Sequence, residues 1–165
     1  MHSFFTAEFF AGNRQKLRAA VGSDVPIVVT ANGQLQANGD NAFAFRQDSN
    51  FWYLTGIDEP DCVLVIGKTS EYLIVPTLSK VKEIFDGSLD GDALRAASGI
   101  EQVLEQKEGW LLVRELLAQR KQVATLLSPP AYIAQIGLFT NPARQRLIKK
   151  LRSLGSGLEL VDVRK

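Results

Sequence analysis

The 165-residue chain contains one cysteine and one histidine, and the scarcity of both residues excludes several kinds of chemistry. A single cysteine, Cys62, cannot form an internal disulfide, and without a second cysteine or an internal histidine there is no zinc ligand set. The histidine is His2, in a terminus that we expect to fray, so a Ser/His or Cys/His nucleophilic pair is excluded. Cys62 opens the apolar run from Val63 to Ile66, and we therefore predict a packed, unreactive thiol.

An excess of charge of one sign is also lacking. Lys and Arg number 19 and Asp and Glu number 18, which leaves a net charge of +1. No strong field therefore favours a nucleic acid or a membrane surface, and we expect neither as a partner. No apolar run approaches the roughly 20 residues of a membrane-spanning helix, and residues 1–20 lack the long apolar segment of a signal peptide. We predict a cytoplasmic protein.

Hydrophobic residues make up 45% of the chain, enough for one sizeable core, and we expect residues 1–165 to form a single domain. Helices are expected over 7–21, within 86–99, over 108–121 and over 141–155, with a short amphipathic piece over 79–85. Strands are expected at 26–31, 61–67, 71–76, 122–131 and 158–163, the second and third as a hairpin, with a Gly/Asn-rich loop over 33–42. This alternation predicts an α/β fold with a mixed β-sheet flanked by helices.

Two of these helices carry charge patterns of interest. In the first, Phe9, Phe10, Leu17 and Val21 form the apolar face, and the basic residues are expected mostly on the opposite side. In the last, a basic run lies opposite inward-facing leucines. The run contains Arg144, Arg146, Lys149, Lys150 and Arg152. We interpret it as a solvated face, with a nucleic-acid surface as the alternative.

The most informative stretch is FRQDSNFWYLTGIDEPDCVLVI, residues 45–66. A polar run from Arg46 to Asn50 precedes an aromatic triplet, and in an extended chain alternate residues point to opposite sides, so some polar side chains must be buried. A buried Arg46 needs an acceptor, and Asp48 is the nearest carboxylate. We interpret the stretch as a hydrogen-bonded corner that supports the sheet, with a direct ligand or interface role as the alternative. Arg46→Ala should then cost on the order of 3 kcal/mol.

The same stretch closely resembles the signature of the N-terminal domain of Xaa-Pro aminopeptidases (aminopeptidase P), relatives of prolidase and creatinase. The matching parts are R-Q-D-S-N, F-W-Y, L-T-G, E-P and the apolar strand that follows. Its signature residues here are Arg46, Asp48, Tyr53, Gly56, Glu59 and Pro60. The helix near the start and the segment KEIFDGSLDG, residues 82–91, which is similar to the family's E-I-W-x-G, extend the resemblance over essentially the whole chain.

The resemblance implies a ribonuclease-H-like mixed sheet, and it implies that catalysis resides elsewhere. In this family two divalent metals, typically manganese, are held by two Asp, two Glu and one His in a C-terminal pita-bread domain. That domain normally begins just after the strand matching 158–163. We therefore expect residues 1–165 to be an N-terminal domain separated from a longer protein, with no catalytic residue, no metal ligand and no cofactor of its own.

Three positions carry over from the family as sites of substrate access or oligomer contact. Asp40 and Arg46 resemble residues near the subunit contacts, and Phe85 takes the place of an aromatic, usually Trp, that reaches a neighbouring subunit's active-site mouth. Phe in place of Trp removes an indole N–H donor and keeps an apolar wall.

The implied function is that of a non-catalytic domain in a metal-dependent enzyme that removes the N-terminal residue preceding proline. The expected partners are its own catalytic domain, the subunits of a homo-oligomer and peptides with proline at the second position. Two alternatives stay open: a non-catalytic peptide-binding module, and the N-terminal domain of a prolidase-type Xaa-Pro dipeptidase.

Overall fold

The computed structural model describes residues 4–78, 89–155 and 157–164. Its helices are α1 (Ala7–Val21), α2 (Ser49–Thr55), α4 (Gly91–Ser98), α5 (Gln106–Leu117), α6 (Tyr132–Gln135) and α7 (Ala143–Leu154). Its strands are β1 (Ile27–Thr30), β2 (Gln36–Asn38), β3 (Asn41–Ala42), β4 (Val63–Ile66), β5 (Glu71–Val75), β6 (Gln102–Glu105), β7 (Gln122–Thr125) and β8 (Glu159–Asp162). Within this part of the chain no helix is long and apolar enough to cross a membrane.

Six strands form the central sheet in the order β6-β5-β4-β1-β7-β8, and β2 pairs with β3 in a separate hairpin. Strand β4 runs antiparallel to both of its neighbours, β1 and β5, whereas the β5–β6, β1–β7 and β7–β8 pairs are parallel. The sheet is therefore mixed and contains the β4–β5 hairpin, as the sequence predicts.

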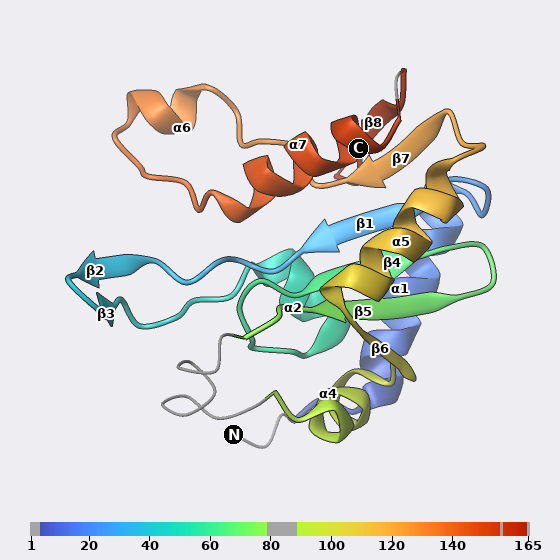
Figure 1. Cartoon of the computed structure of the whole chain (residues 1–165), viewed down its shortest axis with the longest axis horizontal. Coiled ribbons are helices and arrows are strands. Elements are labelled where there is room, and N and C mark those ends of the chain that lie inside the picture. The colour runs from blue at the N-terminus through green and yellow to red at the C-terminus, as the bar shows by residue number, and fades with distance from the viewer. Residues whose placement is uncertain (1–3, 79–88, 156, 165) are drawn as a thin grey trace.

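Helices cover both faces of the sheet (Figure 1). One face packs against α1, α2 and α4, with Val29 and Leu64 turned toward them, and the other packs against α5 and α7, with Val28 and Val65 turned that way. Strands β1 and β4 are buried on both sides and for this reason read as continuous apolar runs in place of an alternating pattern. The predicted fold class is confirmed.

Four parts of the fold differ from the sequence prediction, and one of them is α6, a short helix in a stretch for which no element was predicted. Strand β6 was not predicted, because its sequence QVLE carries only two apolar residues and becomes a strand through parallel pairing with β5. The Gly/Asn-rich loop contains the β2–β3 hairpin, and the stretch after it contains helix α2. The expected amphipathic piece over 79–85 lies outside the described residues.

Two segments project from the same end of the sheet, beyond the carboxyl ends of β1 and β7 (Figure 1). One is the β2–β3 hairpin, which follows β1, and the other contains α6, which follows β7. Asp40 and Arg46, two of the three expected interface residues, lie at this end of the sheet together with α2 of the signature stretch.

Candidate functional site

The signature stretch contains helix α2, the loop that follows it and strand β4, and Asp48 is the N-cap of α2. Asp48 Oδ1 accepts hydrogen bonds from the backbone N–H groups of Asn50, at 2.9 Å, and Phe51, at 3.2 Å. A carboxylate at this position satisfies N–H groups that have no partner within the helix. Its second oxygen, Oδ2, accepts from Arg144 Nη2 of α7 at 2.6 Å, and both side chains of this ion pair are largely buried. Asp48 thus ties the start of α2 to a helix on the other face of the sheet.

Gln47 is the centre of the corner, and the sequence analysis did not single it out. Its Oε1 accepts from the backbone N–H groups of Asn32 and Asp48, at 3.0 and 2.9 Å. Its Nε2 donates to the carbonyls of Ile57 and Glu59, at 3.2 and 3.0 Å. A side-chain amide both donates and accepts. Gln47 therefore joins the chain after β1 to the start of α2 and to the loop between α2 and β4.

The expectation of a buried Arg46 paired with Asp48 was wrong. The Arg46 side chain is exposed, and in the described part of the chain no carboxylate forms an ion pair with it. Its carbonyl accepts from Asn32 Nδ2 at 2.9 Å, so only the Arg46 backbone takes part in the corner. The reason is that α2 begins directly after Asp48 and turns this carboxylate toward Arg144. The predicted corner therefore exists but is built from neighbouring residues.

The end of α2 contains the next signature residues. Gly56 adopts a left-handed conformation with φ of 68°, and a Cβ there would overlap the ring of Phe10. Tyr53 is half-exposed, and its ring meets that of Phe9 edge to face at 6.0 Å. Pro60, in the loop before β4, is partly buried. Tyr53 and Gly56 lie at the end of α2 and pack against α1, and the three residues do not form a set of side chains typical of a catalytic site.

A buried arginine of α1 donates a hydrogen bond to the same end of α2. Arg14 of α1 is fully buried, contrary to the expectation that the basic residues of α1 face mostly outward. Its Nη1 donates to the carbonyls of Leu54, at 2.8 Å, and Ser98, at 2.9 Å, and its Nη2 donates to Glu71 Oε1 at 2.8 Å. Leu54 and Ser98 lie in the last turns of α2 and α4, where unpaired carbonyls favour a cation.

The two helix ends share a motif that the sequence contains but the sequence analysis missed. Residues 55–57 are Thr-Gly-Ile and residues 98–100 are Ser-Gly-Ile. In each, the hydroxyl donates to the carbonyl four residues earlier and accepts from the isoleucine N–H. In each, the glycine is left-handed. One guanidinium thus binds two equivalent helix ends.

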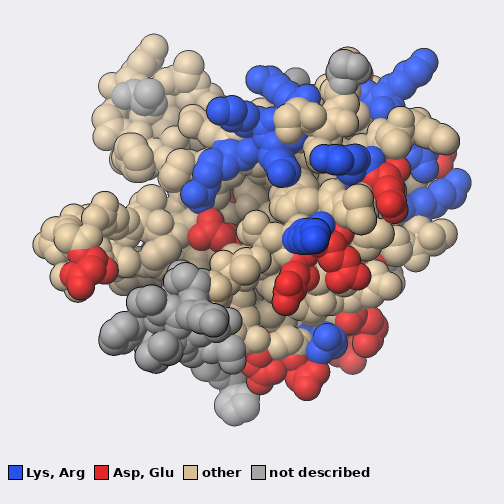
Figure 2. Space-filling model, viewed as in Figure 1, with Lys and Arg blue, Asp and Glu red and all other residues tan. Residues whose placement is uncertain are grey.

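The projecting segments form a mostly uncharged surface that we call the projecting edge. It consists of the β2–β3 hairpin and the segment that contains α6, and Figure 2 shows few charged side chains on either. Large apolar side chains are exposed there: Phe43 (61%), Tyr132 (56%), Ile136 (62%), Leu138 (59%) and Phe139 (83%). Exposed apolar surface on this scale is typical of a contact with another protein.

The residues expected at subunit contacts lie near this edge but do not form one cluster. Asp40 is exposed in the turn between β2 and β3, and Arg46 lies on the return from the hairpin to α2. In the described part of the chain, no hydrogen bond or ion pair joins these two side chains. Phe85 lies outside the described residues. The role of all three in substrate access or oligomer contact stays a prediction.

The described residues do not offer a metal centre. Among them, no group of three or more His, Cys, Asp or Glu side chains is placed to hold a metal ion. This part of the chain therefore does not fit the two-metal centre that the family resemblance implies for the complete enzyme. Cys62 is buried at the start of β4, and burial raises the pKa of its thiol to about 12, which keeps it protonated and unreactive, as predicted.

Comparisons with known proteins agree with this architecture. Human Xaa-Pro aminopeptidase 3 is 32% identical over 161 residues, covering 84% of this chain and 32% of its own length. The mouse Xaa-Pro aminopeptidase 3 is 29% identical over 165 residues, covering 88% of this chain and 33% of its own length. The chain thus spans about a third of the length of these curated relatives.

Solved structures show the same fold. Aminopeptidase P from Escherichia coli, in a low-pH form, aligns with a TM-score of 0.70 and 26% identity over 98% of this chain and 38% of its own. A structure from Bacillus anthracis aligns with a TM-score of 0.80 and 21% identity over 96% of this chain and 38% of its own. The family model for the aminopeptidase P N-terminal domain matches residues 10–125. The chain therefore belongs to the family of aminopeptidase P N-terminal domains.

Proposed function

We propose that this chain is the non-catalytic N-terminal domain of a metal-dependent Xaa-Pro aminopeptidase, where it contributes to oligomerisation and substrate access. The observation that carries the proposal is the projecting edge of a domain that belongs to this family. Phe139 is 83% exposed. Burying an apolar side chain of this size is worth roughly 2 kcal/mol of free energy relative to leaving it in water. Contact with another protein surface would recover it.

The partners we propose for this edge are the domain's own catalytic domain and the other subunits of a homo-oligomer. Asp40 at the hairpin turn and Arg46 at its base are free to meet opposite charges at the rim of such a contact, where charges set orientation more than affinity. Phe85 is proposed as an apolar wall near the path of a peptide with proline at its second position. A cytoplasmic location belongs to the same proposal.

Peptide-bond cleavage then belongs to two divalent metals, typically manganese in this family, in a C-terminal domain. The described residues of this chain supply no ligand set for them. The chain alone should therefore release no residue from an Xaa-Pro peptide, with or without manganese. Manganese-dependent release that follows this chain through purification would contradict the proposal.

The decisive test uses the complete product of the gene that encodes this chain. It should cleave longer Xaa-Pro peptides with manganese, and its mass should show an oligomer by light scattering after gel filtration. Phe139→Ser should weaken the oligomer, whereas Leu111→Ser, at a half-exposed leucine of α5 away from the projecting edge, should leave it unchanged. Cleavage of dipeptides only would favour the prolidase-type enzyme. Peptide binding without cleavage would favour the binding module.

A further inference from the structure

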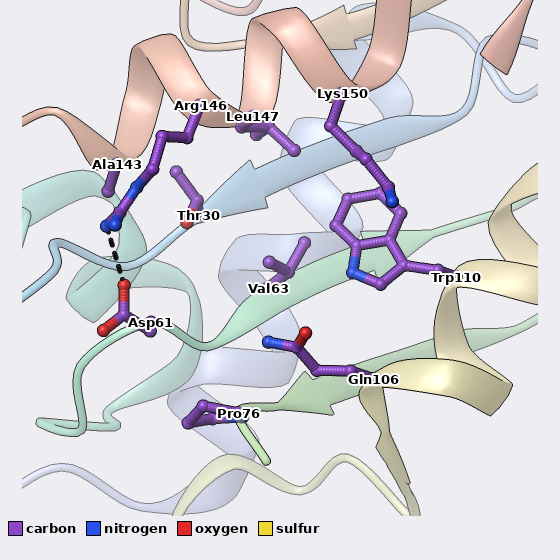
Figure 3. A pocket seen from close by; sticks show the side chains of 10 residues that line it. All are labelled: Thr30, Asp61, Val63, Pro76, Gln106, Trp110, Ala143, Arg146, Leu147 and Lys150. Atoms are coloured by element: carbon purple, nitrogen blue, oxygen red, sulfur yellow. Dashed lines mark hydrogen bonds and ion pairs between the residues drawn. The ribbon is translucent and has the colours of Figure 1, made fainter. Parts of the chain in front are cut away.

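A cleft opens between α5 and α7 on one face of the sheet, where β1 ends and β4 begins (Figure 3). Its volume is about 440 Å³, within the range of pockets that hold small organic ligands. The side chains of Val63, Pro76 and Leu147 give it an apolar floor. Gln106, the first residue of α5, is exposed and points into the cleft, where its amide can meet a polar group.

Two cations of α7 form one wall of the cleft. Arg146 and Lys150 lie one helical turn apart, and both line the cleft. Figure 3 shows that Arg146 reaches toward Asp61 at one end of the cleft and Lys150 reaches toward Trp110 at the other. Lys150 Nζ lies 5.2 Å from the ring centroid of Trp110, and no carboxylate of the described part of the chain pairs with it. Helix α7 carries five Lys and Arg residues and no acidic residue, and Figure 2 shows these cations gathered over it.

The backbone beneath the cleft positions the Arg146 guanidinium. Its Nη2 donates to Asp61 Oδ1 at 2.9 Å, and this is the one side-chain bond it makes to the described residues, so its other nitrogens can still donate. Asp61 has φ of 59°, a left-handed conformation that few residues other than glycine adopt. A Cβ at Gly33 would overlap the Arg146 guanidinium. The Arg146 guanidinium therefore lies against Gly33 and is held there by Asp61, while most of its side chain stays exposed.

We propose that this cleft binds the C-terminal carboxylate of a short peptide whose last side chain is apolar. Lys150 binds the carboxylate at the Trp110 end of the cleft, the floor accepts the side chain, and Gln106 and the free nitrogens of Arg146 hydrogen-bond the peptide backbone. Arg146 is already paired with the Asp61 carboxylate, so Lys150, with which no carboxylate of the described residues pairs, is the cation left to bind the carboxylate of the peptide. Among the described residues that line the cleft there is no glycine, and a glycine-rich cradle of backbone N–H groups is typical of phosphate sites.

The site is separate from the projecting edge, and binding there does not require the proposed function. It can be tested on the 165-residue chain by NMR, with the indole N–H of Trp110 as the reporter and Trp110→Phe to assign it. The probe is N-acetyl-Ala-Leu with a free carboxylate, and the paired control is the same peptide as its C-terminal amide. The free acid should shift the Trp110 signal in a saturable way, and the amide should bind about tenfold more weakly, the value of one charge-assisted contact.

Lys150→Met should weaken binding of the free acid by about tenfold. The matched control is Lys149→Met, which removes the same charge from the next residue of α7, where the side chain lines a different groove beside Ile148 and Arg152. This control should leave the affinity within about twofold, because an exposed charge outside the cleft acts only through the screened field. Arg146→Met serves as a second variant if Lys150→Met disturbs the spectrum of the folded protein.

Four results would overturn the proposal. They are equal binding of the acid and the amide, equal weakening by the Lys149 and Lys150 variants, a Trp110 shift caused by inorganic phosphate and not by the peptide acid, and no saturable shift at all. The first would indicate an apolar groove, the second a diffuse positive field and the third an anion site for phosphate. None of these readouts depends on peptidase activity, so failure here and failure of the proposed function are distinguishable.

Discussion

Substitution of Arg14 by alanine is expected to lower the free energy of unfolding by about 4 kcal/mol. The guanidinium is fully buried and donates to two main-chain carbonyls, at Leu54 and Ser98, and to the carboxylate of Glu71. Each buried carbonyl that loses its donor costs about 1–3 kcal/mol. Glu71 contributes less, because its side chain is 26% exposed and water can replace the lost partner.

Two further variants separate the charge of Arg14 from its shape. Arg14→Lys keeps the charge but presents one nitrogen in place of a planar fork, so it should recover about half of the loss. Arg18→Ala is the control on the same helix: Arg18 meets Glu71 at 3.4 Å, and both side chains are partly exposed, so the loss should stay below about 1 kcal/mol.

The measurement is urea unfolding at neutral pH, followed by circular dichroism at 222 nm. The wild-type chain should unfold in one cooperative transition. A domain of this size has a total stability of about 5–15 kcal/mol, so a loss of about 4 kcal/mol should leave Arg14→Ala folded but with a clearly lower urea midpoint. If the wild type lies at the low end of that range, Arg14→Lys supplies the measurable value. An Arg14→Ala variant within about 1 kcal/mol of the wild type would refute the reasoning, because the two helix ends would then not need the guanidinium.

Three other expectations concern single sites. Gly56→Ala should lower the free energy of unfolding by at least about 2 kcal/mol, because its methyl would overlap Phe10 and its φ is left-handed. Gly12→Ala is the control, in an open position within α1, and should raise the free energy of unfolding by about 0.5–1 kcal/mol. Thermal unfolding compares the two variants. Tyr72→Phe removes a buried hydroxyl that has no partner among the described residues, so urea unfolding should show no loss and a gain of up to about 1 kcal/mol. Burial raises the pKa of the Cys62 thiol from 9.0 to about 12, so the unfolded chain releases this proton first and stability should fall as pH rises through that window. Cys62→Ala should flatten the fall between urea titrations at about pH 8 and about pH 10.5, and an unchanged slope would contradict the assignment.

Local signals in the sequence were enough to predict much of the fold. The hairpin of β4 and β5 follows from two apolar runs separated by three residues, and its register pairs Val63 with Ile74. The helix predicted over 141–155 forms as α7, and just before it Asn141 Oδ1 accepts from the backbone N–H of Ala143 at 3.1 Å. The signature stretch identified the family. Asp48 also carried an N-cap signal for α2, which was missed because the polar run was treated as extended chain.

Only the tertiary structure decided which polar residues are buried. Helical periodicity places Arg14 among the basic residues of α1, but its acceptors come from positions 40, 57 and 84 residues further along the chain. A charge can be buried when such remote acceptors converge on it, and periodicity carries no information about that convergence. For the same reason Gln47 replaced Arg46 at the centre of the corner. Caps, turns and apolar runs act between near neighbours and can be read from the sequence, whereas a buried hydrogen-bond network depends on how distant elements pack.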